Sequence, residues 1–152
     1  MPLLIINTRI NAPIEICFDL ARSIDLHQVS MKHTGEKAVA GTTKGLIGLD
    51  ESVTWKARHF GILMTLTSKI TEFQFPYMFV DEMVKGPFAR MKHKHLFTEV
   101  EGNTLMVDEF DYTSPLGILG KAADSIFLNK YMTRLLIHRN LVIKNIAESS
   151  TD

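Results

Sequence analysis

Between Glu51 and Thr113 the chain alternates apolar and polar residues and is interrupted only by short turns, a pattern that restricts the fold more than any other feature of the sequence. Successive side chains of a strand point to opposite faces of a sheet, so the alternation predicts strands with one buried face. Turns are expected at Phe60-Gly61, Phe75-Pro76, Lys85-Gly86-Pro87 and Glu101-Gly102. Because every connection is short, neighbouring strands are expected to be antiparallel.

Other elements flank this series of strands. Leu3 to Ile10 predicts a first strand, and the segments from Pro13 to Ala21 and from Ser23 to Met31 predict two short helices. After Pro115, apolar residues recur at helical spacing as far as Ile146, which predicts one long helix of about thirty residues. The sequence therefore predicts an α+β protein, one domain over residues 1–152, in which a long helix lies across a curved antiparallel sheet.

Composition excludes several classes of function. Lys plus Arg and Asp plus Glu both number 17, so the chain offers no basic surface for nucleic acid and no net charge that would attract it to an anionic membrane. Its uncharged stretches are too short for a membrane span, and the single Cys17 predicts a packed thiol in a cytoplasmic protein. No nucleotide-binding loop or serine-hydrolase signature occurs, and no cofactor is expected.

The turns also determine which side chains share a face of the sheet. Two-residue turns pair Trp55 with Leu66 and His95 with Asp108, and the turn at Phe75-Pro76 pairs Glu72 with Phe79 and Ile70 with Asp81. A three-residue turn at Lys85 to Pro87 pairs Asp81 with Met91, which places Asp81 diagonal to His93. One face is then charged and is expected to face water. The other face, which would pack against the long helix as core or as a cavity wall, collects Trp55, Met64, Leu66, Ile70, Phe79, Met91, Phe97, Met106, Phe110 and Tyr112.

Polar residues fall on the same apolar face: His59, Asp81, His93, His95 and Asp108. A buried carboxylate needs a partner, so these residues are expected to interact. Three interpretations stay open: an internal hydrogen-bonded network, the orientation of the polar end of a ligand, and chemistry by a His–Asp pair or a metal site. The absence of HExxH and CxxC spacing argues against metal. The remaining histidines are expected at the surface: His27, His33 and His138.

The order of the elements resembles that of the START-like superfamily (SRPBCC), which includes birch pollen allergen-like proteins, lipid-transfer domains and polyketide cyclases. The residues that carry the resemblance are Ile10-Asn11-Ala12-Pro13, Phe79, Asp81, Gly86-Pro87-Phe88, His93, His95, Phe97, Asp108, Tyr112, Pro115, Gly117 and Leu119-Gly120. They are similar to those of a bacterial branch described as cyclase-like or ligand-binding, although Met83 and Met91 stand where that branch is expected to carry Gln and Trp. The resemblance implies a helix-grip fold with a cavity between the sheet and the C-terminal helix.

This resemblance implies binding or carriage of a hydrophobic or amphipathic small molecule that is lipid-, polyketide- or isoprenoid-like. The residues expected to contact it are Trp55, Met64, Leu66, Phe79, Asp81, Met91, His93, His95, Phe97, Asp108, Phe110, Tyr112, Phe127, Tyr131 and Leu135. The alternative is a polyketide cyclase or dehydratase in which a His–Asp pair drawn from His93, His95, Asp81 and Asp108 acts as acid and base. None of these residues forms a catalytic signature, because the superfamily shares a fold and a cavity rather than one reaction.

Overall fold

The computed structural model describes residues 3–114 and 127–150. The strands within these ranges form one antiparallel sheet in the order β1-β7-β6-β5-β4-β3-β2. They are β1 (Leu3–Ile10), β2 (Lys37–Gly41), β3 (Ser52–His59), β4 (Ile62–Gln74), β5 (Met78–Lys85), β6 (Arg90–Val100) and β7 (Asn103–Thr113). The helices are α1 (Ile14–Ala21), α2 (Ile24–Ser30), the short 3₁₀ helix η1 (Lys32–Thr34) and α4 (Asn129–Ser149).

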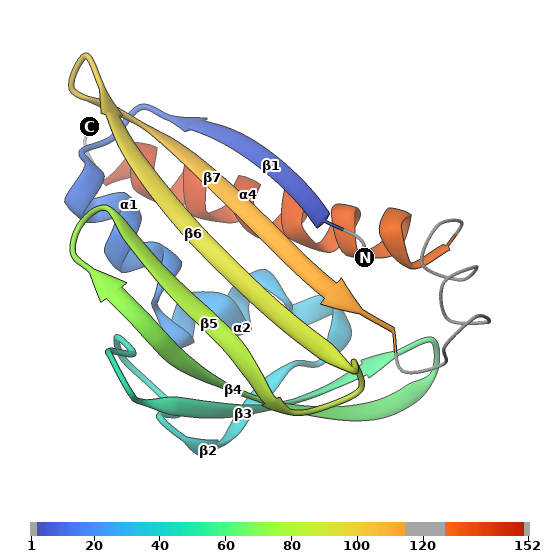
Figure 1. Cartoon of the computed structure of the whole chain (residues 1–152). Coiled ribbons are helices and arrows are strands. Elements are labelled where there is room, and N and C mark those ends of the chain that lie inside the picture. Colours follow the sequence, from blue (N-terminus) through green and yellow to red (C-terminus); the bar gives the residue numbers. More distant parts are fainter. Residues whose placement is uncertain (1–2, 115–126, 151–152) are drawn as a thin grey trace.

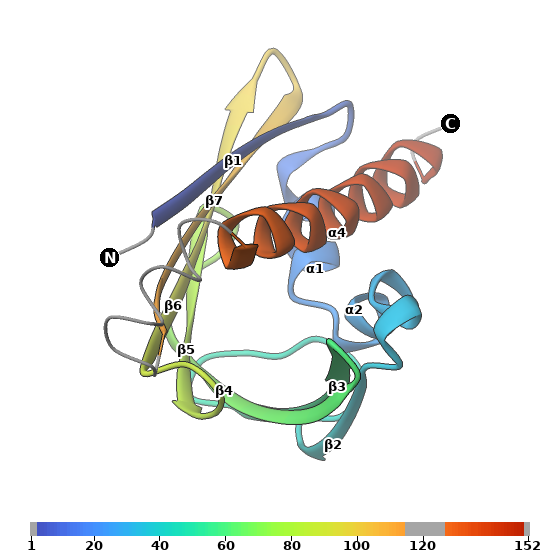
Figure 2. The same cartoon turned by 90° about the vertical axis from the view of Figure 1, so that its right-hand side faces the viewer.

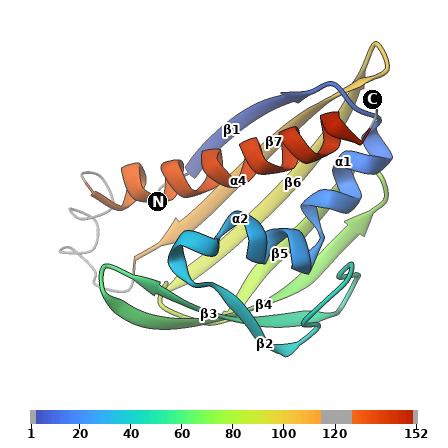
Figure 3. The same cartoon turned by 180° about the vertical axis from the view of Figure 1, so that it is seen from behind.

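The sheet is strongly curved, and α4 crosses its concave side (Figure 1). Figure 2 shows the curvature from the side, with β3 and β2 turned toward the helices. The two short helices lie on the same side of the sheet, and both contact α4 (Figure 3). The predicted α+β arrangement, with two short helices after the first strand and a long C-terminal helix over a curved sheet, is therefore confirmed.

Aromatic packing closes one end of the space between sheet and helices. Phe18 of α1 is fully buried, and its ring meets those of Phe73 and Phe79 edge-on at centroid distances of 5.3 and 5.2 Å. Cys17 beside it is buried, as the sequence predicted, and burial raises the pKa of its thiol. Because these side chains fill the space beneath α1, any open volume must lie farther along the sheet.

Most of the predicted strand pairing is confirmed. Trp55 pairs with Leu66 across β3 and β4, and His95 pairs with Asp108 across β6 and β7. The pairing of β5 with β6 was wrong by two residues, because Asp81 lies opposite His93 rather than Met91. The connection between β5 and β6 is longer than the predicted three residues. A shift of two residues leaves every side chain on its predicted face, since the side-chain period of a strand is two.

A β-bulge changes the pairing within β4. Ile70 pairs with Asp81 as predicted, but the register shifts before Glu72. Phe79 therefore lies opposite Phe73, and the predicted pairing with Glu72 was wrong. The extra residue of the bulge turns Phe73 toward the core and leaves Glu72 exposed.

Two further differences concern elements at the margins of the fold. Strand β2 was not predicted, because its five residues are mostly exposed and show no apolar alternation. The predicted long helix is confirmed over Asn129–Ser149, and its expected beginning after Pro115 lies outside the described residues. None of the helices in residues 3–114 and 127–150 combines the length and apolar character needed to cross a bilayer.

Candidate functional site

A cavity of about 330 Å³ lies between the concave face of the sheet and the helices. Its wall is formed mainly by side chains of β3 to β7, α1, α2 and α4, together with loop residues that include Ile47, Pro87 and Phe88. The volume falls at the lower end of the range of small-molecule pockets, which is roughly 300–1,000 Å³. Core packing therefore leaves room here for a ligand of modest size.

Most of the residues predicted to contact a ligand line this cavity: Trp55, Met64, Leu66, Phe79, Asp81, Met91, His93, His95, Phe110, Tyr131 and Leu135. Their common position follows from strand alternation, which brings the apolar face of the sheet to the concave side. The wall is mainly apolar, and two groups of ionisable side chains stand out in it. One is on β5 and β6, and the other is where β3 meets α2 and α4.

The remaining predicted residues lie outside the cavity lining. Phe97 packs against Phe18 in the closed end of the core. Asp108 is fully buried behind the wall, and the buried Tyr112 donates its hydroxyl proton to Asn129 Oδ1 at 2.6 Å. Phe127 is 57% exposed and contacts the ring of Phe60.

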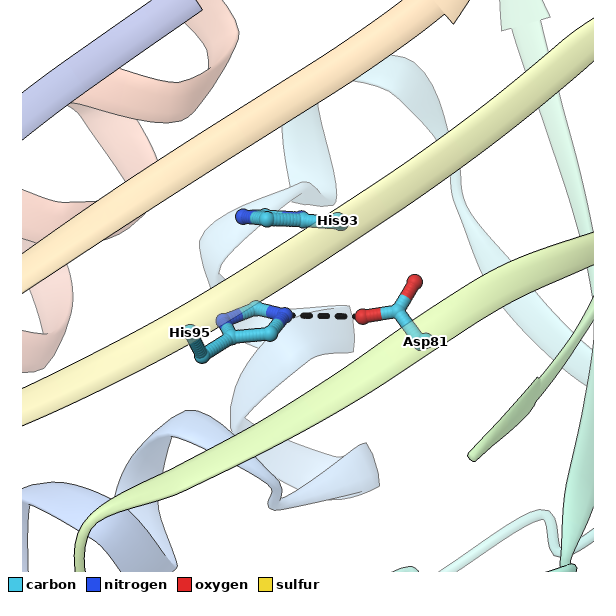
Figure 4. Close-up of side chains that lie close together, drawn as sticks. All are labelled: Asp81, His93 and His95. Atoms are coloured by element: carbon cyan, nitrogen blue, oxygen red, sulfur yellow. Dashed lines mark hydrogen bonds and ion pairs between the residues drawn. The ribbon is translucent and has the colours of Figure 1, made fainter. Parts of the chain in front are cut away.

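Two histidines and an aspartate form the first polar group, drawn in Figure 4. His93 and His95 are neighbours on the inner face of β6, and their rings stack with centroids 3.8 Å apart. They reach in opposite directions, because His95 Nε2 lies 2.7 Å from Asp81 Oδ2 on β5, whereas His93 Nε2 lies 2.7 Å from Asp108 Oδ1 on β7. Both hydrogen bonds are diagonal, since Asp81 is the register partner of His93 and Asp108 that of His95.

Asp108 is held by helix α4 as well as by His93. Asn140 donates from Nδ2 to its second oxygen at 2.6 Å, and Arg139 Nη1 lies 3.4 Å from its first. The same Arg139 nitrogen donates to Asn140 Oδ1 at 2.9 Å, and its Nη2 donates to the carbonyl of Ala21 at 3.2 Å. The carboxylate thus joins β7, β6, α1 and α4 in one buried network.

Sequence reasoning missed Arg139 and Asn140, although a signal was present. The buried face of α4 includes Leu135, Leu136 and Ile143. Positions 139 and 140 fall on the same face at helical spacing. A charged residue on an apolar stripe needs a buried counter-charge, and Asp108 was the available candidate.

Burial and hydrogen bonding set the protonation of this group. Burial would raise the pKa of Asp108, but the hydrogen bond from His93 and the nearby positive charge of Arg139 hold it well below its usual range. Burial lowers the pKa of His93 to about 4, and its neighbour His95 acts in the same direction. At neutral pH Asp108 is therefore ionised and His93 is neutral, so the proton of His93 lies on Nε2, facing Asp108.

With the proton of His93 on Nε2, two hydrogen-bond acceptors remain among the residues that line the cavity. Nδ1 of His93 carries a lone pair and makes no hydrogen bond to the described residues. Burial would raise the pKa of Asp81, but the hydrogen bond from His95 lowers it, so its carboxylate is ionised. Asp81 Oδ1 likewise has no partner among the described residues, and the side chain is 20% exposed where it lines the cavity. The wall at this point therefore presents hydrogen-bond acceptors.

The same three residues are the candidates for a metal site within the described chain. Asp81, His93 and His95 each offer a ligand atom within 4.8 Å of the others, and two imidazoles with a carboxylate suit first-row transition metals. However, both Nε2 atoms are hydrogen-bonded to carboxylates, and the rings lie face to face with an angle of 26° between their planes. A metal in the plane of one ring would lie outside the plane of the other. The geometry therefore suits hydrogen bonding better than ligation.

The second polar group lies across the cavity. Glu36, between η1 and β2, lines it together with His27 and Tyr131. The ring of His27 packs on Trp55 with centroids 4.3 Å apart, and the hydroxyl of Tyr131 is hydrogen-bonded to His59 Nδ1. The prediction that His27 is a surface residue was therefore wrong, because the ring is half-buried against Trp55. His33 and His138 are exposed, as predicted.

Comparisons with known proteins agree with this architecture. A START superfamily protein from Mycobacterium smegmatis superimposes with a TM-score of 0.73 over 97% of each chain at 11% identity. The chain has the START-like helix-grip fold. Zhui aromatase/cyclase from Streptomyces sp. R1128 matches with a TM-score of 0.78 over 99% of this chain and 96% of that one at 12% identity. Ginseng major latex-like protein 151 from Panax ginseng matches with a TM-score of 0.70 over 96% of this chain and 97% of that one at 14% identity.

At these identities the likeness concerns the fold alone. No protein-family profile matches the sequence, and no curated protein matches it by sequence. The cavity and its side chains must therefore carry any argument about function.

Proposed function

We propose that this protein binds an apolar small molecule whose polar end donates hydrogen bonds to Asp81 and His93. The observation that carries the proposal is the 330 Å³ cavity, whose mainly apolar wall contains an ionised carboxylate and a neutral imidazole without ligand-side partners. A buried acceptor left without a donor is unfavourable by about 1–3 kcal/mol, so a donor on the ligand would be selected.

The charge of Asp81 also restricts the head group of the ligand. A carboxylate or phosphate placed beside Asp81 would be repelled in a poorly solvated site. A hydroxyl group, by contrast, can donate to Asp81 Oδ1 or to His93 Nδ1. We therefore favour long-chain alcohols, sterol-like or isoprenoid alcohols and phenols over fatty acids. The apolar body would lie against Trp55, Leu66 and Met91.

Native mass spectrometry of the freshly purified protein, compared with its denatured mass, is the first test. An adduct that is lost on denaturation and has the mass of a neutral hydroxylated lipid would support the proposal. Titration calorimetry with decanol and decanoate then tests the head group, and the alcohol should bind more tightly at pH 7.5. The difference should shrink in Asp81→Asn and persist in Asp50→Asn, which removes an exposed carboxylate outside the cavity lining.

A reaction is the second candidate function, because His93 and Asp108 form a hydrogen-bonded pair with Nδ1 available to the cavity. One fold neighbour is an aromatase/cyclase, which gives a reason to test polyketone cyclisation or dehydration. Against this role, a base with a pKa of about 4 removes protons poorly at neutral pH. Product formation from a poly-β-ketone that is lost in His93→Gln would favour the enzyme. A lack of turnover with retained binding would contradict it.

A further inference from the structure

Glu36 lies at the cavity wall on the side of β3 and α2, where its carboxylate is nearly buried. Its side chain is 11% exposed, and Oε2 is enclosed without a hydrogen bond to the described residues. His27 Nε2 lies 3.1 Å from this oxygen, which is within ion-pair distance but outside hydrogen-bond geometry. A nearly buried carboxylate without a hydrogen-bond donor is unfavourable, and a bound molecule would supply a donor to the part of the side chain that stays accessible from the cavity.

The other polar side chains around Glu36 do not supply that donor. Burial lowers the pKa of His59 and raises that of Tyr131, so both are neutral at physiological pH, and they are hydrogen-bonded to each other. Arg22 also lines the cavity, but its guanidinium is bound to Asp19 Oδ1 at 2.9 Å and to the carbonyl of Ile47 at 3.1 Å. Glu36, His27, His59 and Tyr131 together form a second polar end of the cavity, here called the second pole.

The second pole is well separated from Asp81 and His93. His59 belongs to β3, Asp81 to β5 and His93 to β6, with β4 between β3 and β5. Adjacent strands lie about 4.8 Å apart, so the second pole is separated from Asp81 and His93 by roughly 10–15 Å across the strands. The two groups also lie at different levels along the strands, since the register partners of His59 and Asp81 on β4 are Ile62 and Ile70. The apolar side chains of Trp55, Leu66 and Ile70 line the wall between them.

We infer that Glu36 accepts a hydrogen bond from a hydroxyl or ammonium group at the far end of the ligand, so that preferred ligands carry a donor at both ends of an apolar body. This inference rests on the proposed function, since it names the ligand class for the same cavity. A hydroxyl and an ammonium group share the required chemistry, because each donates to a carboxylate. A molecule with one polar end would leave Glu36 without that hydrogen bond.

Titration calorimetry with α,ω-alkanediols from hexanediol to dodecanediol, each compared with the primary alcohol of the same chain length, tests the inference. When the diol chain is long enough to reach from Asp81 and His93 to the second pole, the diol should bind more tightly than the matching alcohol by on the order of ten- to a hundredfold. The matching ω-amino alcohol distinguishes an ammonium from a hydroxyl partner. A still larger gain for the amine would indicate that Glu36 acts through its charge.

Variants at position 36 assign the effect to this carboxylate. Glu36→Met removes the acceptor at similar volume and should abolish the preference for diol over alcohol. Glu36→Gln keeps a carbonyl acceptor without the charge, so it should retain part of the hydroxyl preference and lose the ammonium preference. Glu99→Gln, an exposed glutamate on β6 outside the cavity lining, is the matched control and should behave as the wild type.

Two outcomes would overturn the inference while leaving the proposed function intact. Diols and alcohols could bind equally at every chain length, or the preference could persist in Glu36→Met. Failure of every alcohol and diol to bind the wild-type protein would instead overturn the proposed function itself. Thermal unfolding of each variant separates a local effect on binding from a loss of folded protein.

Discussion

His93 and His95 stack face to face with ring centroids 3.8 Å apart, yet each donates to a carboxylate on a different neighbouring strand. Asp108, the partner of His93, is fully buried and tied to α4. Asp81, the partner of His95, faces the cavity and keeps an oxygen free of described partners. The two pairs are similar in geometry, but one belongs to the framework of the protein and the other to the binding surface.

The pair formed by His93 and Asp108 should therefore matter mainly for stability. Asp108→Asn leaves the buried Arg139 without its counter-charge, which should lower the free energy of unfolding by about 3–5 kcal/mol. Asp81→Asn should lower it by only about 1 kcal/mol, because the amide oxygen still accepts from His95. Urea unfolding measures both values, and Glu109→Gln on the outer face of β7 serves as the control. Equal losses for Asp108→Asn and Asp81→Asn would contradict this division.

Stability should decrease as the pH falls from about 6.5 to about 4. The folded-state pKa of His93 is about 4, whereas an unfolded histidine has a pKa near 6.5, so within this window the unfolded chain binds more protons. The loss should be roughly 3 kcal/mol, and His59, whose pKa burial also lowers, acts in the same direction. Below pH 4, Asp108 and Asp81 add a further loss, because their lowered pKa values favour the folded state only while they are ionised.

Urea unfolding at several pH values tests this dependence. His93→Gln should flatten the decrease between pH 6.5 and 4, whereas His33→Gln, which alters an exposed ring, should retain it. An unchanged slope in His93→Gln would mean that His93 does not stay neutral in the folded protein.

The sequence predicted the faces of the strands better than their register. The error at β5–β6 was two residues, so His93, His95 and Asp81 stayed on the inner face although their partners changed. The bulge before Glu72 could not be foreseen, because nothing in the alternation of β4 shows where an extra residue is accommodated. Diagonal hydrogen bonds likewise depend on how far each ring reaches, which register alone does not determine.

The second pole shows a different limit of sequence reasoning. His27 belongs to a short helix, Glu36 to a loop and His59 to the end of a strand, so no periodic pattern connects them. They meet only because the sheet curves and brings β3 beneath α2 (Figure 2). The open volume is also a property of packing, since the same apolar residues could have filled the space.

Filling the cavity should abolish binding without unfolding the protein. Ala57 is buried on β3 and lines the cavity, so Ala57→Phe places an aromatic ring in the open volume. Decanol binding should weaken at least about tenfold, while the free energy of unfolding stays within about 1 kcal/mol of the wild type. Calorimetry and urea unfolding give these values, and Ala40→Phe on the exposed surface of β2 is the control. Undiminished binding to Ala57→Phe would place the ligand elsewhere.

Gly41 should be required for the pairing of β2 with β3. Its φ is +74°, and a Cβ at this position would collide with the carbonyl oxygen of Ser52 on β3. Gly35 has a similar φ of +69°, but a Cβ there would meet no atom within 4 Å, so Gly35→Ala carries only the backbone strain, about 1 kcal/mol. In urea unfolding, Gly41→Ala should lower the free energy of unfolding by about 2 kcal/mol more than Gly35→Ala does, because the backbone of β3 must also shift. Equal losses for the two variants would mean that β2 separates from β3 at little cost.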